Sequence, residues 1–272
     1  MSPVTAREVE HLGIIWSSID ELCSSLGRAD WNAETDLPGW SVKDVVAHLA
    51  GSESFFLGRP LPEHDPGERD HVKNDLGSVN EAAVDFRRSH SPREILDEFR
   101  AVTEERLIEI SALTEADLQV DTWTPVGPGT MRDLLATRVV DAWTHEQDIR
   151  RAAERPGHLD GPVPVAVAER LMQAMPYVIG KRAAASDGST VSFEVGDPPV
   201  VIQSVGVEGS RARPLVTAPS DPDVWFGVDI ETFGCLTCGR WTPEQARVRG
   251  QLELRGDEVL GERVLNEINV ML

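Results

Sequence analysis

The stretch RVVDAWTHEQDIRRA, residues 138–152, decides the fold because it combines an apolar seam with a polar stripe at helical spacing. Apolar residues recur at spacings of four, three and seven along one side of this segment and the residues just before it: Leu135, Val139, Ala142 and Ile149. Thr130, with Asp133 three residues later, predicts the first turn of a helix that Pro156 ends near Glu154. An apolar side of this length must be covered by other helices, so the segment predicts one member of a helical bundle.

Three further segments of the first half carry the same signals. Each begins with a Ser or Thr cap and an acidic residue three positions later, and these pairs are Thr5 with Glu8, Ser41 with Asp44, and Ser91 with Glu94. Residues 59–90 are rich in charge, Pro and Gly, which predicts a long, partly ordered connection with one short helix at residues 79–88. DTWTPVGPGT, residues 121–130, predicts turns. We therefore expect a four-helix bundle over residues 1–157.

The character of the sequence changes after residue 157. Predicted strands cover residues 189–195, 200–207 and 246–256, and predicted helices cover residues 163–184, 222–238 and 257–271. These segments predict a small α+β domain over residues 158–272, so the whole chain is expected to be an α+β protein of two domains.

Composition excludes several classes of protein. The chain has 272 residues with 46 acidic and 26 basic side chains, and its net charge of −20 would repel a phosphate backbone, which excludes nucleic acid as a partner. There is no apolar run long enough to span a membrane and no signal-peptide pattern, so a cytoplasmic protein without a membrane partner is expected. The three cysteines are too few for a disulfide framework and fit a reducing compartment. Composition leaves the oligomeric state open.

A metal site is suggested by three side chains on two predicted helices. Asp141 and His145 are four residues apart, so they project from one face of a helix and can bind a common ion. His48 lies in VVAHLAG, on or beside the apolar face of another helix, where a buried imidazole needs a partner. His48, Asp141 and His145 would form a three-ligand site with positions left for water or substrate. The spacing also fits the alternative of hydrogen-bonded structural side chains.

Two motifs together resemble a known family. DLPGWSVKDVVAHLAGSE, residues 36–53, followed later by VVDAWTHEQDIRRA, resembles the mycothiol-dependent maleylpyruvate isomerase family, a branch of the DinB-like metalloenzymes. The resemblance implies a DinB-like bundle that binds a divalent ion, usually zinc, through residues matching His48 and His145. The acidic position of the family holds Asp141, which is one methylene shorter than the family's Glu, so coordination would require a small shift of the helix or the ion.

The resemblance also supplies roles for residues outside the three ligands. Asp148 falls in the family's H-x2-D pattern, which implies that it orients the ligands; the alternative is an ion pair with Arg151 or Arg138. FGCLTCGRW, residues 233–241, and the sequence after it resemble the sterol-carrier-like domain of the same family. There Arg240 is a candidate for holding an anionic substrate or a thiol carboxylate, with a salt bridge as the alternative.

Two groups of side chains have no clear chemical assignment from the sequence. Cys235 and Cys238 form a C-x2-C pair without further ligands nearby, so we expect small buried side chains rather than a zinc or redox site. Four tryptophans are candidates for the wall of a pocket, with packing in the core or between domains as the alternative: Trp40, Trp123, Trp143 and Trp241.

These expectations combine into one leading function and two alternatives. The leading function is a zinc-dependent transferase or isomerase that activates mycothiol, as a cosubstrate, for S-transfer to an electrophilic small molecule or for its thiol-assisted isomerisation. The second is a thiol-independent metal-dependent isomerase, cyclase or hydrolase. The third is a non-catalytic module that binds a small molecule and has lost its metal.

Overall fold

The computed structural model describes residues 6–271, so the predicted cap at Thr5 lies outside the described residues. The chain divides into two compact units, Met1–His158 and Leu159–Leu272. The first unit contains, in chain order, α1 (Arg7–Ser24), α2 (Arg28–Trp31), α3 (Val42–Phe56), α4 (Asp75–Arg87), α5 (Pro92–Ser111), α6 (Glu115–Leu118), β1 (Asp121–Thr124), β2 (Gly127–Thr130) and α7 (Met131–Ala152).

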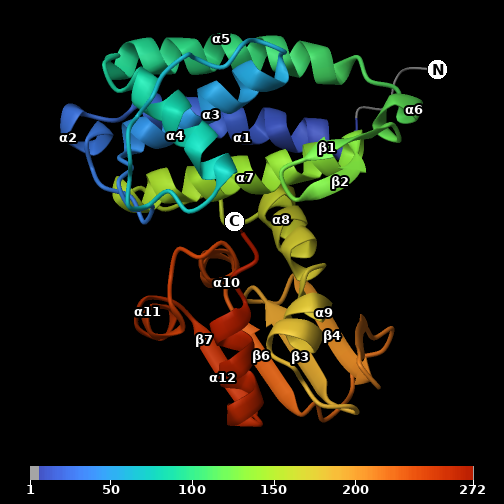
Figure 1. Ribbon diagram of the computed structural model, residues 1–272. Coiled ribbons are helices and arrows are strands. Elements are labelled where there is room, and N and C mark those ends of the chain that lie inside the picture. The colour runs from blue at the N-terminus through green and yellow to red at the C-terminus, as the bar shows by residue number, and fades with distance from the viewer. Residues whose placement is uncertain (1–5, 272) are drawn as a thin grey trace. The chain divides into compact units, whose positions relative to one another are not determined.

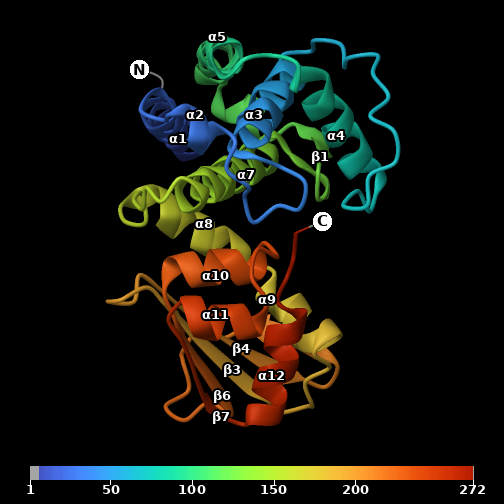
Figure 2. The ribbon, with the colours of Figure 1, turned by 90° about the vertical axis from the view of Figure 1, so that its left-hand side faces the viewer.

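The four long helices α1, α3, α5 and α7 form the predicted bundle (Figure 1). Helix α1 packs on α5 and α7, and α3 packs on the same two helices, so each apolar face is covered by its neighbours. The bundle core contains fully buried side chains from all four helices, including Ile15, Leu49, Phe99 and Leu135. Helix α4 lies against α3 on the outside of the bundle (Figure 2).

The predicted helix caps are confirmed in the structure. The side chains of Ser41, Ser91 and Thr130 accept hydrogen bonds from the backbone N–H three residues later, and the acidic residue at that position accepts one in return. These capping boxes begin α3, α5 and α7 at the expected residues. Because α3 and α7 carry the candidate ligands, these caps help to set where the ligands lie.

Two predictions in the first unit were incomplete. The helix expected at residues 79–88 is α4, which begins earlier, at Asp75, because the side chain of Asn74 accepts a hydrogen bond from the N–H of Gly77. Residues 121–130, predicted only as turns, form the antiparallel hairpin β1–β2. Two Gly and two Pro residues in this stretch mask the strand signal, since both types disfavour strands.

The second unit is built on one five-stranded sheet with the order β5-β4-β3-β6-β7. Its elements are α8 (Pro162–Met172), α9 (Met175–Tyr177), the π-helical turn η1 (Val178–Arg182), β3 (Thr190–Val195), β4 (Val201–Glu208), β5 (Arg211–Pro214), β6 (Val224–Val228), α10 (Ile230–Thr237), α11 (Pro243–Arg249), β7 (Leu252–Gly256) and α12 (Glu258–Glu267). Strands β3 and β6 are parallel, and the other pairs are antiparallel. Phe193, Phe226 and Phe233 pack together in the core of this unit. The helical first unit and this sheet with its helices confirm the predicted α+β fold class.

Several boundaries predicted in this unit were wrong. Residues 222–238 were expected to be one helix, but the apolar run VWFGV forms β6, and α10 begins only after Asp229, which caps it. The strand expected over residues 246–256 is α11 followed by the shorter β7, and β5 was not foreseen. Short apolar runs have no periodicity that separates a buried strand from a buried helix, which explains these errors.

A glycine and an aspartate shape the turn before the last helix. Gly256 has a φ of +92°, and an added Cβ would lie 2.1 Å from the carbonyl oxygen of Asp223, so only glycine fits there. Asp257 follows, and its side chain accepts a hydrogen bond from the N–H of Leu260 at the start of α12. The residue pair Gly256–Asp257 is therefore required by the turn and by the start of α12.

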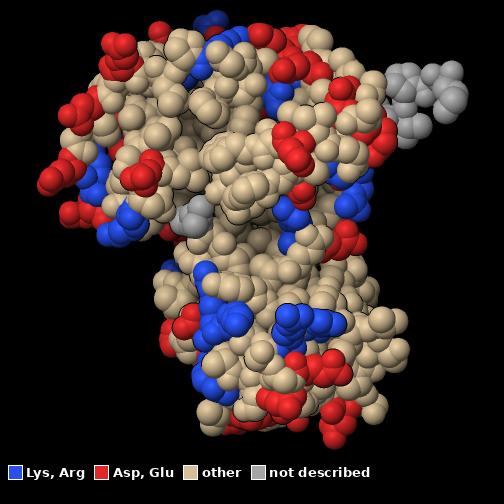
Figure 3. All heavy atoms as spheres, turned by 45° about the vertical axis from the view of Figure 1, so that its right-hand side comes forward, with Lys and Arg blue, Asp and Glu red and all other residues tan. Residues whose placement is uncertain are grey.

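The surface charge and the state of the cysteines agree with the expectations from the amino-acid composition. Figure 3 shows acidic side chains spread over the visible face, with basic side chains among them. In the part of the chain that the structure describes, no helix combines the length and apolar character needed to cross a bilayer. Cys235 and Cys238 are buried, as predicted, and neither they nor the buried Cys23 form a disulfide among the described residues.

Removing the cap of α7 should destabilise the first unit measurably. In Thr130→Ala the N–H of Asp133 loses its side-chain acceptor, so we expect the free energy of unfolding to fall by about 1 kcal/mol. Urea denaturation followed by circular dichroism measures this change. Ser111→Ala removes an exposed hydroxyl at the end of α5 and should change the same quantity by less than about 0.5 kcal/mol. Equal effects of the two substitutions would contradict the assignment.

Candidate metal centre

The structure brings together the three side chains predicted as metal ligands. His48 projects from α3, and Asp141 and His145 project from α7, with one ligand atom of each lying within 4.8 Å of the others. The Nε2 atom of His48 lies 3.6 Å from Oδ2 of Asp141, and Nε2 of His145 lies 3.7 Å from Oδ1. The carboxylate therefore faces both imidazoles, one with each oxygen.

His48 is the most constrained member of the cluster. It is 6% exposed, and its Nε2 atom is buried and lacks a hydrogen-bond partner within residues 6–271, because the distance to Asp141 is too long. Burial lowers the pKa of His48, against the opposing effect of the Asp141 carboxylate, so the neutral ring is favoured. A neutral imidazole with an unused ring nitrogen is the form that binds metals.

Asp141 is kept ionised by a buried arginine. Burial alone would raise the pKa of Asp141, but the charges of Arg138 and His145 and the contact with His48 hold it well below its ordinary value. Nη1 of Arg138 donates to Oδ2 of Asp141 at 2.8 Å, and the same guanidinium pairs with Oε1 of Glu53 at 2.7 Å. One buried cation thus serves two carboxylates, and it lies over the ring of Phe56.

His145 is oriented by a chain of charged residues. Its Nδ1 atom lies 3.1 Å from Oδ2 of Asp148, which is fully buried, and this contact leaves Nε2 facing the cluster. Arg151 donates to the other oxygen of Asp148 at 2.6 Å and to Asp36 at 2.6 Å. Asp148 therefore makes both of the contacts considered for it, one to His145 and one to Arg151, whereas Arg138 pairs elsewhere.

Trp40 connects the cluster to a polar network on the outer side of α3. Its indole ring lies 5.2 Å from the ring of His48 and 6.3 Å from that of His145, measured between centroids. Its Nε1 atom donates to Oε2 of Glu81 at 2.8 Å. Glu81 is fully buried on α4, so this helix fixes the indole that covers the two imidazoles.

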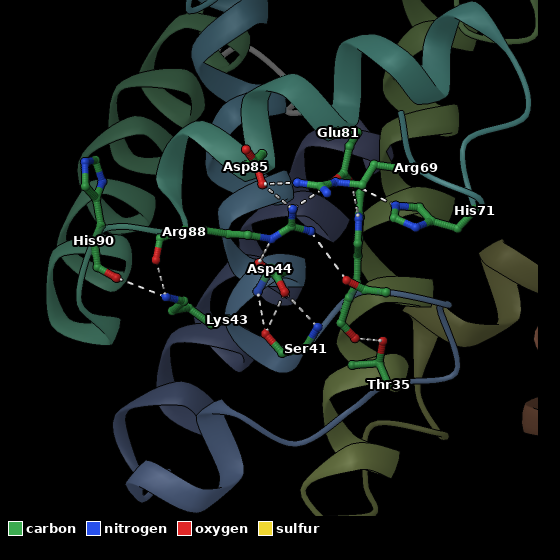
Figure 4. A network of polar contacts seen from close by, with 12 residues as sticks. Thr35, Ser41, Lys43, Asp44, Arg69, His71, Glu81, Asp85, Arg88 and His90 are labelled. Carbon is green, nitrogen blue, oxygen red and sulfur yellow. Dashed lines mark hydrogen bonds and ion pairs between the residues drawn. The ribbon is translucent and has the colours of Figure 1, made fainter. Parts of the chain in front are cut away.

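Glu81 and Asp85 share their cations in the network of Figure 4. Burial would raise the pKa of Glu81, but hydrogen bonds from His71, Trp40 and Arg88 outweigh it and lower that pKa. Arg88 also donates to Asp85, and through Nε to Asp44 at 3.2 Å. Because Asp44 belongs to the capping box of α3, the network ties α4 to the helix that carries His48.

A cavity of about 480 Å³ in the first unit reaches the cluster. His48, Asp141 and Arg138 form its polar end. The rest of its wall comes from the second half of α3, the segment after it, α4 and the β1–β2 hairpin, and consists of Gly51, Ser52, Phe55, Phe56, Leu61, Asp75, Leu76, Val79, Asn80, Ala83, Trp123 and Pro125. The cluster is therefore reachable by a small molecule.

The remaining candidates, the tryptophans and Arg240, lie in different surroundings in the structure. Trp123 lines the cavity, whereas Nε1 of Trp143 donates to the carbonyl of His158. Arg240 belongs to the second unit, where its Nη1 atom donates to the carbonyl of Cys238 at 2.8 Å, and Trp241 beside it is buried. The anion-binding role of Arg240 stays a prediction.

Glu53 and Glu81 were missed by the sequence analysis, although both are buried acids near the site. Glu53 is the last residue of the quoted segment 36–53 and follows the largely apolar run VVAHLAG on the same helix. A charge in such a setting is a signal. Glu81 gave no such signal, because it lies in a segment rich in charge.

Comparison with known proteins agrees with this architecture. Residues 12–150, about half of the chain, match the family model described as the mycothiol maleylpyruvate isomerase N-terminal domain. The structure of the mycothiol-dependent maleylpyruvate isomerase is similar with a TM-score of 0.56 at 14% identity, covering 89% of this chain and 94% of that chain. A histidine-to-alanine mutant of that enzyme gives 0.55 at 14% identity, with 89% and 93% covered. No curated protein sequence matches the chain.

The network behind Trp40 predicts a pH-dependent stability. Hydrogen bonding to His64, together with Arg88 and Arg69, lowers the pKa of Asp85 from 3.8 to about 2, so the ionised form stabilises the fold above pH 4. Asp85→Asn should therefore reduce the free energy of unfolding at pH 7 by about 1 kcal/mol, and this difference should disappear as the pH falls from 4 through 2. Urea denaturation at a series of pH values measures it.

Asp97 on α5 provides the control, because its contacts to Arg93 and Arg100 are exposed. Asp97→Asn should leave stability nearly unchanged across the same pH range. A difference for Asp85→Asn that is independent of pH would contradict the charge-based account.

Proposed function

The chain belongs to the mycothiol maleylpyruvate isomerase family and is therefore an enzyme, and we propose that it holds a divalent metal at His48, Asp141 and His145 to activate mycothiol against an electrophilic small molecule. The observation that carries the proposal is the buried Nε2 atom of His48, which makes no hydrogen bond within residues 6–271 and lies beside a carboxylate and a second imidazole. Leaving such an atom without a partner is costly, and an ion at this position would satisfy it.

The donor set fits zinc. Two imidazole nitrogens and one carboxylate oxygen are ligands that catalytic zinc sites use, and three protein ligands leave room for a further ligand. The contact of His145 with Asp148 is the kind of support that fixes the orientation of a metal-binding imidazole. We propose Asp148 as a positioning residue for this reason. The shorter side chain of Asp141 still reaches the space between the two imidazoles.

The chain would hold the thiol at the polar end of the cavity. When bound, a divalent ion lowers the pKa of a thiol that shares its site and favours the nucleophilic thiolate. The thiol would lie beside His48, Asp141 and His145, and the cavity wall beyond these residues would hold the electrophile. Trp40, fixed by Glu81, limits the space around the two imidazoles.

One addition step leads to either proposed outcome. The sulfur forms a bond to the electrophilic carbon of a conjugated carbonyl compound, and the electron pair of the carbon–carbon double bond moves toward the carbonyl oxygen. If rotation about the former double bond follows and the electron pair returns, the carbon–sulfur bond breaks and the isomer leaves with the thiol regenerated. If the carbon next to the carbonyl takes up the proton lost by the thiol, the conjugate persists. Transfer and isomerisation are therefore proposed jointly.

Two further elements of the proposal lie outside the metal cluster. We propose Arg240 as a binding group for oxygen atoms of the thiol, since its planar guanidinium can donate two parallel hydrogen bonds. We also propose that the enzyme works in the cytoplasm, because a thiol cosubstrate must stay reduced and the three cysteines form no disulfide in the described residues.

Loss of either imidazole should empty the metal site. Removing one of three ligands should lower zinc affinity by at least about 100-fold in His48→Ala and in His145→Ala, since even supporting residues of such sites contribute 10–100-fold. Metal analysis of protein purified without chelator, and calorimetric titration of the apoprotein with zinc, measure the change.

His90→Ala is the matched control, because His90 lies in the same unit but outside the cluster. It should bind zinc like the unaltered protein, and Cys235→Ser should do so as well. Full zinc occupancy in His48→Ala would show that the three-residue site is wrong.

Dependence on the thiol tests the chemical part of the proposal. We expect turnover of an electrophilic enone only when mycothiol is present, with either an isomerised product of unchanged mass or a conjugate heavier by the mass of the thiol. Mass spectrometry of the products distinguishes these two results. Turnover at the same rate without any thiol would instead support a thiol-independent metal enzyme.

A further inference from the structure

The cavity beside the metal cluster carries an inference about the substrate, which rests on the function proposed above. Beyond its polar end, the cavity wall is dominated by large apolar side chains: Phe55, Phe56, Leu61, Leu76, Val79 and Trp123. A volume of about 480 Å³ is within the range of pockets for small organic ligands. The bulk of the bound molecule would therefore contact hydrocarbon and aromatic surface.

Several of these apolar side chains are unusually exposed. Phe55 is 43% exposed, Val79 42% and Trp123 56%, although each borders the same cavity. Leu61, which follows α3 in the chain, is 41% exposed. Large apolar side chains gathered around one cavity, rather than scattered singly, mark a surface that an apolar ligand covers.

The charged residues of the cavity wall also favour an apolar ligand. Its charged lining residues are Asp75, Asp141 and Arg138. The cation of Arg138 is already committed to two carboxylates, those of Asp141 and Glu53, and Glu53 is itself buried. Beyond the polar end, where the proposed metal ion would add positive charge, the charged residue of the lining is Asp75, so this part of the wall offers no cation to a carboxylate of the substrate.

From these observations we propose that the electrophile accepted by this cavity is uncharged and apolar, of the class of aryl- or alkyl-substituted enones, rather than a carboxylate or dicarboxylate. A carboxylate buried against this wall would lose its hydration without gaining a partner. An apolar substituent would instead gain about fourfold in affinity for each methylene group that the wall covers.

A matched pair of probes tests the substrate class. 4-Phenyl-3-buten-2-one and its derivative with a carboxylate at the para position of the ring react with thiols at the same carbon and differ in charge. With mycothiol and the zinc-loaded protein, we expect kcat/KM to be at least about tenfold higher for the uncharged ketone. Binding of the unreactive saturated analogues, 4-phenyl-2-butanone and its para-carboxylate, is measured by calorimetry and should show the same preference.

A substitution in the wall should alter this preference without touching the cluster. Val79→Lys places a cation on α4 at the edge of the cavity, at a side chain exposed enough to tolerate it, and should reduce the preference for the uncharged analogue by at least about fivefold. Ile108→Lys makes the same change on α5 at a side chain that is 69% exposed and outside the cavity wall, and should leave the preference unchanged.

The two readouts separate failure of this inference from failure of the proposed function. Preferred binding of 4-phenyl-2-butanone without any thiol-dependent product supports the substrate class and contradicts the proposed function. Thiol-dependent turnover that favours the carboxylate probe supports the proposed function and overturns the proposed substrate class. The inference is also overturned if neither saturated analogue binds, or if Val79→Lys and Ile108→Lys have equal effects on the preference.

Discussion

Burial of charge on α7 is the constraint on which the rest of the first unit depends. This helix passes through the bundle with a polar side, and Arg138, His145, Glu146 and Asp148 on it are all nearly inaccessible to solvent. Buried charges destabilise a fold unless they are paired, so every neighbouring helix must supply partners. Glu53 of α3 pairs with Arg138, Asp36 reaches Asp148 through Arg151, and Ser18 of α1 donates to Glu146. The charges that α7 buries therefore constrain which residues of the bundle must pack against it.

The range of each interaction along the chain separates what the sequence predicts from what it cannot. Capping boxes and apolar spacing are local, and they located α3, α5 and α7 to within a few residues. The pairing of His48 with the two side chains of α7 was also accessible, because helical spacing and the family resemblance both indicated it. Partners such as Glu81, which meets Trp40 across 41 positions of sequence, depend on tertiary packing and leave no local pattern. The short strand β6 was lost for a related reason, since its apolar run continues into a buried helix.

The pairing of charges is complete at the edges of the cluster and incomplete at its centre. Asp141 has Arg138 on one oxygen, and His145 has Asp148 on Nδ1, so two of the three candidate ligands are held in place by a charged partner. The Nε2 atom of His48, which faces the space between the ligands, makes no hydrogen bond in the described chain. Side chains that are held firmly on their outer sides and left unsatisfied on their shared inner side are preorganised for a common ligand, and they lose little entropy when it binds.

The surroundings of the cluster also bear on which molecules can react there. An ion at this position would sit where the cavity changes from charged side chains to aromatic and aliphatic ones, so a sulfur atom held at the polar end would face an apolar space. A substrate that filled this space would exclude water from it, which would strengthen the attraction between unlike charges at the polar end. Arg138 is already paired with Glu53 and Asp141, and it lies at the polar end with the cluster. Positive charge is therefore confined to that end, and the apolar wall beyond it favours the uncharged electrophile that we propose.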